Sequence, residues 1–185
     1  MKRKIVFIGN SIVNGFPFKR SQCFVSLIRE ATKWDVINKG NNGETTADIL
    51  TRFDRDVISH APDTVFIMTG TNDFIYKEAS PKGAFDNLMI MVQRARAEGI
   101  TPVMLTPVPV NAEMASRLWM SGAGINYDDV NAQLEELTQL IKASDIEYVD
   151  LNDAYKSCGL YHDGIHPLPE GHSFIADTIM NFIHK

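Results

Sequence analysis

The sequence predicts an α/β fold, in which a parallel β-sheet carries helices on both faces. Short apolar runs alternate with amphipathic stretches along the chain, a pattern typical of strands that alternate with helices. The runs, such as residues 5–8 and 65–68, are apolar at every position, as expected for strands buried on both faces. With 185 residues and 44% apolar content, the chain is expected to form one domain, residues 1–185.

The first part of the chain is expected to contribute strands at 5–8, 36–37 and 65–68. Gly9 ends the first of these strands and Gly70 ends the last, and a polar segment at 38–45 follows the middle one. Two helices are predicted by apolar residues at helical spacing: Val25, Leu27, Ile28 and Ala31 for the first, and Ile49, Leu50, Phe53 and Val57 for the second.

The remaining part of the chain continues this alternation. Ser80 suits the N-cap of the next helix, Pro81 suits its first turn and Gly99 suits its end. The apolar face of this helix is expected to consist of Phe85, Leu88, Met89 and Val92. Strands follow at 102–105 and 148–149. Two further helices are predicted by Val130, Leu134, Leu137 and Ile141, and by Phe174, Ile175, Ile179, Phe182 and Ile183.

The segment at 107–126 has no clear period and follows the strand at 102–105. It contains the apolar residues Met114, Leu118, Trp119 and Met120, followed by Gly122 and Gly124. We expect a flap that lines the substrate site and hinges at these glycines. The alternative is a short helix packed on the body of the protein.

Composition excludes several classes of protein. The net charge is −5, and no run of Lys or Arg offers a surface for phosphates, so no nucleic-acid partner is expected. Cys23 and Cys158 are too few for a disulfide framework. No stretch reaches membrane-spanning length, and the apolar run at 5–8 is too short for a signal peptide. A cytoplasmic protein without membrane insertion is expected, and its oligomeric state is left open.

Four polar segments follow predicted strands or can fold back to their carboxyl ends, where open parallel sheets bind ligands. They are Gly9–Gly15, Asn38–Thr45, Gly70–Asp73 and Asp163–Pro167. Taken together they supply the parts of an acyl-transfer site. Ser11 can act as nucleophile if His166 takes its proton, and Asp163 can orient the imidazole. The backbone N–H groups of Ser11 and Gly43 and the side-chain amide of Asn72 can stabilise an oxyanion.

Each of these residues also has a purely structural explanation. Ser11 could cap a helix, Gly43 could serve a turn, and Asn72 could form an Asx turn. Asp163 and His166 could belong to a helix start. We favour the site because four unrelated turns are not expected to supply nucleophile, donors, base and orienting group together.

Metal and cofactor chemistry are not expected. His162, His166 and His172 lie near Asp163 in the sequence, but a metal site requires neutral imidazoles that converge on one point, and we interpret His162 and His172 as surface residues or neighbours of the site. The chain contains no Gly-x-Gly-x-x-Gly after a strand and no Walker lysine, so nucleotide and flavin binding lack support. Cys23 is interpreted as a structural residue.

The four segments resemble the four blocks of the SGNH hydrolases, also called GDSL-type esterases and lipases. The resemblance implies a three-layer, flavodoxin-like sandwich with five parallel strands in the order 2-1-3-4-5. It implies Ser11 as nucleophile, His166 as base, Asp163 as its partner, and Gly43 and Asn72 as oxyanion donors with Ser11. Gly40 competes with Gly43 for that role. The first block usually has Asp before the serine, and Asn10 stands there instead. We expect Asn10 to keep a structural hydrogen-bonding role beside Ser11.

The function expected from these residues is a serine esterase that hydrolyses small carboxylic esters through an acyl-serine intermediate. A thioesterase or a carbohydrate-ester deacetylase would use the same residues. A non-catalytic, flavodoxin-like binding module is the alternative from a different class, and Asn10 is the feature that favours it.

Overall fold

The computed structural model describes residues 3–184 of the chain. At its centre lies a five-stranded sheet in the order β2-β1-β3-β4-β5, and all neighbouring strands pair in parallel. The strands are β1 (Lys4–Gly9), β2 (Asp35–Gly40), β3 (Thr64–Met68), β4 (Thr101–Leu105) and β5 (Glu147–Val149). This arrangement confirms the predicted fold class and strand order.

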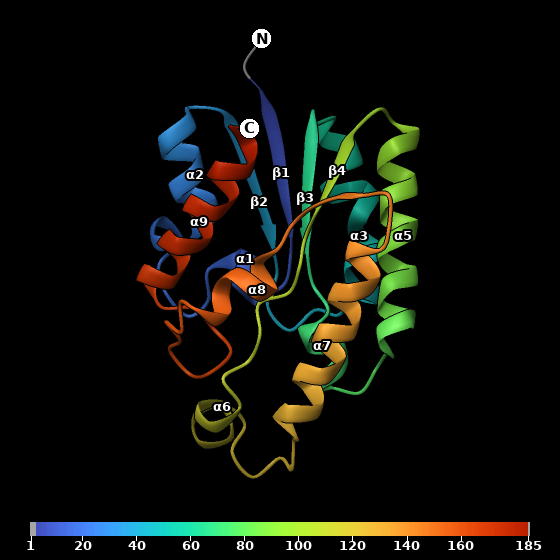
Figure 1. Cartoon of the computed structure of the whole chain (residues 1–185). Coiled ribbons are helices and arrows are strands. Elements are labelled where there is room, and N and C mark those ends of the chain that lie inside the picture. Colours follow the sequence, from blue (N-terminus) through green and yellow to red (C-terminus); the bar gives the residue numbers. More distant parts are fainter. Residues whose placement is uncertain (1–2, 185) are drawn as a thin grey trace.

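Helices cover both faces of this sheet, with α2 and α9 on one face and α3, α5 and α7 on the other (Figure 1). These long helices are α2 (Phe24–Thr32), α3 (Thr46–Asp56), α5 (Pro81–Ala97), α7 (Tyr127–Lys142) and α9 (Pro169–Ile183). The shorter helices are α1 (Ser11–Asn14), η1 (Arg20–Gln22), η2 (Ile58–His60), α4 (Thr71–Ile75), α6 (Ala112–Leu118) and α8 (Leu151–Lys156). Among the residues described, no helix combines the length and apolar character needed to cross a membrane.

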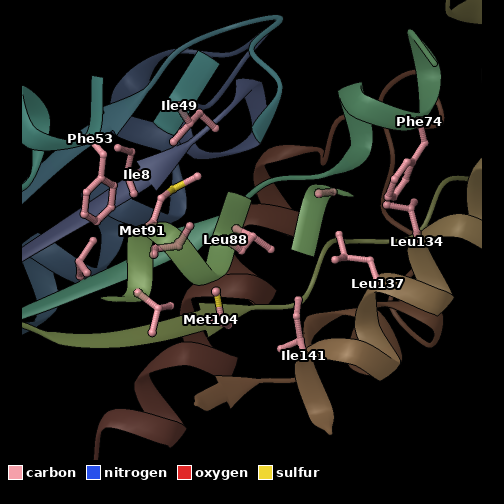
Figure 2. Packing of buried hydrophobic residues seen from close by; sticks show 14 of the residues in the cluster. Ile8, Ile49, Phe53, Phe74, Leu88, Met91, Met104, Leu134, Leu137 and Ile141 are labelled. Atoms are coloured by element: carbon pink, nitrogen blue, oxygen red, sulfur yellow. The ribbon is translucent and has the colours of Figure 1, made fainter. Parts of the chain in front are cut away.

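The strands divide their side chains between two apolar cores, because successive residues of a strand point to opposite faces. Ile8 and Met104 face α3, α5 and α7, where they pack in one cluster with Phe53, Leu88 and Leu137 (Figure 2). On the other face, the rings of Phe7 and Phe66 stack with their centroids 4.8 Å apart, and Phe24 of α2 meets Phe7 edge-on. Burial on both faces explains why the runs at 5–8 and 65–68 are apolar at every position.

Helix α5 begins as predicted, because the Ser80 side chain accepts a hydrogen bond from the N–H of Gly83 and Pro81 occupies the first turn. Leu88 and Val92 are buried as predicted, but the rest of the buried face is rotated from the prediction. Met91 is buried, whereas Phe85 and Met89 are only partly buried. The face that α5 buries depends on its contacts with α3 and α7, which helical spacing in the sequence does not specify.

Strand β2 is longer than the predicted strand at 36–37. Its pairing with β1 continues from Asn38, which is the partner of Phe7, to Gly40, which is the partner of Gly9. The pairing uses backbone groups, and β2 is an edge strand whose side chains are only partly covered, so polar residues fit there. The predicted stripe of α2 is also wrong at Ala31, which is exposed, while Phe24 is buried.

Residues 107–126 contain the short helix of the alternative interpretation. This helix, α6, lies beyond the carboxyl ends of the strands (Figure 1), and its Ala115 is buried. Gly122 and Gly124 both have positive φ angles. The hinged motion of this segment stays a prediction.

Candidate active site

Ser11 is the first residue of α1, directly beyond the end of β1. The N-cap position belongs to Asn10, so the alternative in which Ser11 caps a helix does not describe this turn. The Ser11 side chain points to His166, and its Oγ lies 2.9 Å from Nε2 of the imidazole. The two residues are 155 positions apart in the sequence, so the tertiary structure brings them together.

Asp163 holds the imidazole of His166 from the other side. Its Oδ2 lies 2.8 Å from Nδ1 of His166, and its Oδ1 accepts hydrogen bonds from the N–H groups of Ile165 and His166. A carboxylate can only accept, so Nδ1 carries the proton and Nε2 is free to accept from the Ser11 hydroxyl. Burial acts to raise the pKa of Asp163, but the hydrogen bonds from His166 and Ile165 outweigh it and lower that pKa.

The turn that carries Asp163 and His166 packs tightly against α6. Gly164 in this turn has a φ of +94°, and a Cβ there would collide with the backbone of Ala115 and Asn111. The N–H of Asn111 donates to the carbonyl of Gly164 over 2.8 Å. Only glycine satisfies both the backbone angle and the close approach, which joins the His166 turn to the segment at 107–126.

Ser11 and His166 lie at the wall of a cavity of about 230 Å³. The cavity is lined by Ser11, Phe16, Asn42, Gly43, Asn72, Ile75, Tyr76, Trp119, Ile165 and His166. Gly43, with a φ of +79°, therefore lies beside Ser11. Gly40 belongs to β2 and packs so closely on α1 that a Cβ there would collide with the backbone of Val13 and Asn14. Of these two glycines, the structure places only Gly43 at this cavity.

Asn72 and its neighbour connect the segment after β3 to the segment after β2. The Asn72 side-chain amide donates to the carbonyl of Glu44 over 2.9 Å, and it keeps a second N–H. The buried carboxylate of Asp73 accepts from both the N–H and the hydroxyl of Thr46, at the start of α3. Burial raises the pKa of Asp73, and the hydrogen bonds from Thr46 oppose that effect. These contacts hold Asn72 beside Gly43.

Residues 7–174 match the GDSL-like Lipase/Acylhydrolase family. The chain belongs to this family. It is therefore a hydrolase of the GDSL esterase and acylhydrolase group. The match contains all four segments in which the sequence predicted site residues.

The chain is also similar to individual known proteins. The chain is 35% identical over 118 residues to the uncharacterized lipoprotein YqeF of Bacillus subtilis strain 168, covering 57% of this chain and 49% of that one. It therefore spans about half the length of that relative. It is 26% identical to an arylesterase of Vibrio mimicus, covering 98% of this chain and 88% of that one. A G-D-S-L lipolytic family member from Veillonella parvula DSM 2008 shares the fold, with a TM-score of 0.82, 16% identity and 99% coverage of both chains.

Two aromatic side chains enclose His166 in this GDSL-family protein. The ring centroids of Trp119 and Phe16 lie 4.7 and 4.9 Å from that of the imidazole, both near 68° to its plane. The carbonyl of Trp119 accepts a hydrogen bond from the Tyr127 hydroxyl. Trp119 was expected to line the site, whereas Phe16 was missed because nothing in its sequence surroundings distinguishes it from a core residue.

Sequence reasoning also missed Arg52, a buried cation. Arg52 of α3 is 9% exposed, donates to the carbonyl of Gly9 over 3.1 Å and pairs with the carboxylate of Glu44. Its guanidinium also pairs with Asp56 at 2.9 Å. The spacing of Arg52 and Asp56, four apart on a helix, was the one signal available in the sequence.

The remaining predicted residues lie as follows. Asn10 is buried and its side chain does not cap α1, and its expected hydrogen-bonding role beside Ser11 stays a prediction. His162 is exposed, whereas His172 is fully buried, so of the two interpretations given for His172 the surface one is wrong. Cys23 is buried against the carbonyl of Val13, and burial raises the pKa of its thiol to about 11. Among the described residues, no three metal-binding side chains converge.

Proposed function

We propose that this protein is a serine esterase that hydrolyses small carboxylic esters through an acyl-Ser11 intermediate. The observation that carries the proposal is the hydrogen-bonded series Ser11–His166–Asp163 at the wall of a cavity. His166 Nε2 takes the proton of the Ser11 hydroxyl while Oγ attacks the ester carbonyl carbon. Asp163 keeps the imidazole in the required tautomer and stabilises the imidazolium that forms.

Gly43 and Asn72 have the role of stabilising the negative charge that develops on the carbonyl oxygen. In the proposal, the N–H groups of Ser11 and Gly43 and the free N–H of the Asn72 amide donate to this oxyanion. The placement of Gly43 and Asn72 on the Ser11 cavity supports this role. The contact between Asn72 and the Glu44 carbonyl positions the amide before substrate arrives.

The second half of the reaction releases the alcohol and then the acid. His166 passes its proton to the leaving oxygen as the carbon–oxygen bond of the ester breaks. A water molecule then gives its proton to His166 and attacks the acyl carbon, and Ser11 regains its proton as the acid leaves. Because Ser11 and His166 come from opposite ends of the chain, the proposal assigns residues 1–185 to one catalytic domain.

The size of the cavity supports a short acyl group. Its volume of about 230 Å³ is smaller than the roughly 300–1,000 Å³ of pockets that hold drug-sized ligands. Ile75, Tyr76 and Ile165 give it apolar walls beside Gly43 and Asn72. We therefore assign acetyl to butyryl esters as the preferred acyl range.

The test of the proposed function compares wild type with Ser11→Ala. Wild type is expected to react with a fluorophosphonate probe and to hydrolyse p-nitrophenyl acetate, because an activated serine does both. Ser11→Ala is expected to lose both activities while keeping the circular dichroism spectrum of wild type. Ser173→Ala, which removes an exposed hydroxyl from α9, is the control and should retain both.

Two outcomes would contradict the proposal. A folded wild-type protein that neither reacts with the probe nor hydrolyses the ester would favour the non-catalytic binding module. A Ser11→Ala variant that keeps most of the turnover would exclude Ser11 as nucleophile.

A further inference from the structure

The position of His166 determines the side on which the alcohol of an ester leaves, given the proposed function on which this inference rests. His166 Nε2 has to reach both Ser11 Oγ and the leaving oxygen, because it takes the proton from one and gives it to the other. The oxyanion points instead toward Gly43 and Asn72. The alcohol therefore extends from Ser11 on the side of His166.

On that side lie the rings of Phe16 and Trp119, which meet each other edge-on with centroids 6.2 Å apart. Both rings contact the imidazole and both line the Ser11 cavity. The same two rings also form the wall of a second cavity of about 350 Å³. It is lined by Phe16, Pro17, Leu118, Trp119, His162 and Asp163. The two cavities thus adjoin at this aromatic pair, which packs on the imidazole of His166, and His166 itself lines only the Ser11 cavity.

We propose that this second cavity, the alcohol cavity, binds the alcohol part of the ester and selects uncharged alcohols that carry a ring. The two parts of the bound ester then lie in different cavities. The short acyl group lies in the Ser11 cavity, and the larger alcohol lies on the other side of the aromatic pair, in the alcohol cavity. The assignment adds a second binding site to the proposed esterase and specifies its substrate class.

The lining of the alcohol cavity explains the preference for an uncharged ring. Phe16 and Trp119 offer aromatic surfaces on which a flat group packs, and Leu118 adds an apolar side chain that is 59% exposed. The carboxylate of Asp163 is bonded to His166, so an anionic alcohol gains nothing from it and is repelled. Among the described residues that line this cavity there is no Lys or Arg to attract an anion.

Of the two cavities, a substitution at Leu118 changes the alcohol cavity alone, because Leu118 lines that cavity and does not line the Ser11 cavity. Ethyl acetate and benzyl acetate share an acyl group and differ in the alcohol, so the ratio of their kcat/KM values measures recognition of the alcohol. Wild type is expected to prefer benzyl acetate. Leu118→Asp is expected to lower kcat/KM for benzyl acetate by about tenfold or more, the scale of a lost apolar contact in a pocket. Its kcat/KM for ethyl acetate should fall less than its kcat/KM for benzyl acetate, so that the ratio of the two values falls.

Two matched variants control for charge and for the acyl side. Met120→Asp places the same charge on the same exposed segment but outside both cavities, so it should leave the benzyl-to-ethyl ratio unchanged. Ile75→Ala widens the Ser11 cavity alone, and it should shift the preference among p-nitrophenyl acetate and butyrate without changing the benzyl-to-ethyl ratio. Leu118→Ala, which adds no charge, repeats the main test in case Leu118→Asp disturbs α6.

The outcomes separate this inference from the proposed function. If the protein reacts with fluorophosphonate and hydrolyses p-nitrophenyl acetate, but the Leu118 variants change both acetates equally, the alcohol cavity is wrong and the esterase assignment stands. If Leu118→Asp and Met120→Asp change the benzyl-to-ethyl ratio equally, the assignment of the alcohol cavity is also wrong. If wild type shows neither labelling nor hydrolysis, both proposals fail.

Discussion

Arg52 is the residue that ties together the segments beside Ser11 and Gly43. Its guanidinium bonds the carbonyl of Gly9, two residues before Ser11, and the carboxylate of Glu44, the residue after Gly43. The carbonyl of Glu44 in turn accepts from Asn72. A buried cation is stable here because Glu44 and Asp56 both pair with it and the Gly9 carbonyl accepts a further hydrogen bond from it. Arg52 is therefore a positioning residue for the proposed oxyanion donors.

Replacing Arg52 with Met is expected to lower the free energy of unfolding by about 3 kcal/mol, because the Glu44 carboxylate loses its cation while Asp56 keeps Lys39 and Arg55. Since the segments at Ser11 and Gly43 lose their connection, kcat should fall more than KM rises. Urea denaturation and steady-state kinetics measure the two effects. Arg94→Met removes an exposed ion pair with Asp54 and should change the free energy of unfolding by no more than about 1 kcal/mol. Equal effects of the two variants would contradict the positioning role.

At the scale of the element, α9 buries a histidine in an apolar setting. The His172 ring stacks on Phe24 of α2 with centroids 6.0 Å apart. Within the described part of the chain, neither ring nitrogen has a hydrogen-bond partner. Burial lowers the pKa of His172 to about 4, with a smaller contribution from His166. The packing of α9 on α2 therefore requires the neutral form of this side chain.

His172 makes the stability of the protein depend on pH in a defined window. The unfolded chain binds a proton at His172 below about pH 6.5, whereas the folded chain does so only near pH 4. Between these values the unfolded state binds more protons, so the free energy of unfolding falls as the pH falls. His172→Leu removes this contribution, which amounts to about 3 kcal/mol between pH 7 and pH 4.

Urea denaturation of wild type and His172→Leu at pH 7, 5.5 and 4 tests this prediction. The wild-type free energy of unfolding should fall more steeply than that of the variant over this range. Both proteins share the carboxylates that also respond to acid, such as Asp56, whose pKa is lowered mainly by its hydrogen bond with Arg55. If the two curves run parallel, His172 does not titrate differently in the folded and unfolded states.

At the scale of the whole molecule, the residues that stabilise the fold are separate from the residues of the candidate active site. The two apolar cores fill the space between the sheet and the long helices, while the Ser11 cavity lies at the segments that follow the strands. Leu88 of α5 is buried in one of these cores and lines neither the Ser11 cavity nor the alcohol cavity. Truncation of such a residue should therefore change stability without changing the reaction.

Leu88→Ala is expected to lower the free energy of unfolding by about 2–5 kcal/mol, because it removes apolar contacts and leaves a cavity. Under native conditions kcat/KM should stay close to wild type. Ile90→Ala changes a residue of the same helix that is 40% exposed, and its effect should be about 0.5 kcal/mol or less. Thermal and urea denaturation measure both variants. A similar loss of unfolding free energy in the two variants would show that the buried face of α5 contributes no more to stability than its exposed face.

Much of the architecture could be predicted because it follows from local patterns. Continuous apolar runs indicated strands buried on two faces, and helical spacing indicated the helices between them. Ser80 and Pro81 marked the start of α5 because capping is a local interaction. The polar segments after the strands pointed to one edge of the sheet, where the structure brings Ser11 and His166 within 2.9 Å.

Only the tertiary structure decided the contacts between residues that are far apart in the chain. The packing of Gly40 on α1 left Gly43 as the glycine at the cavity, and the pairing of Arg52 with Glu44 joined two segments. Phe16 and Trp119 came together around His166 only because α1 and α6 lie beside the same turn. Such contacts depend on burial and shape across the whole fold, and these leave no period or spacing in the sequence.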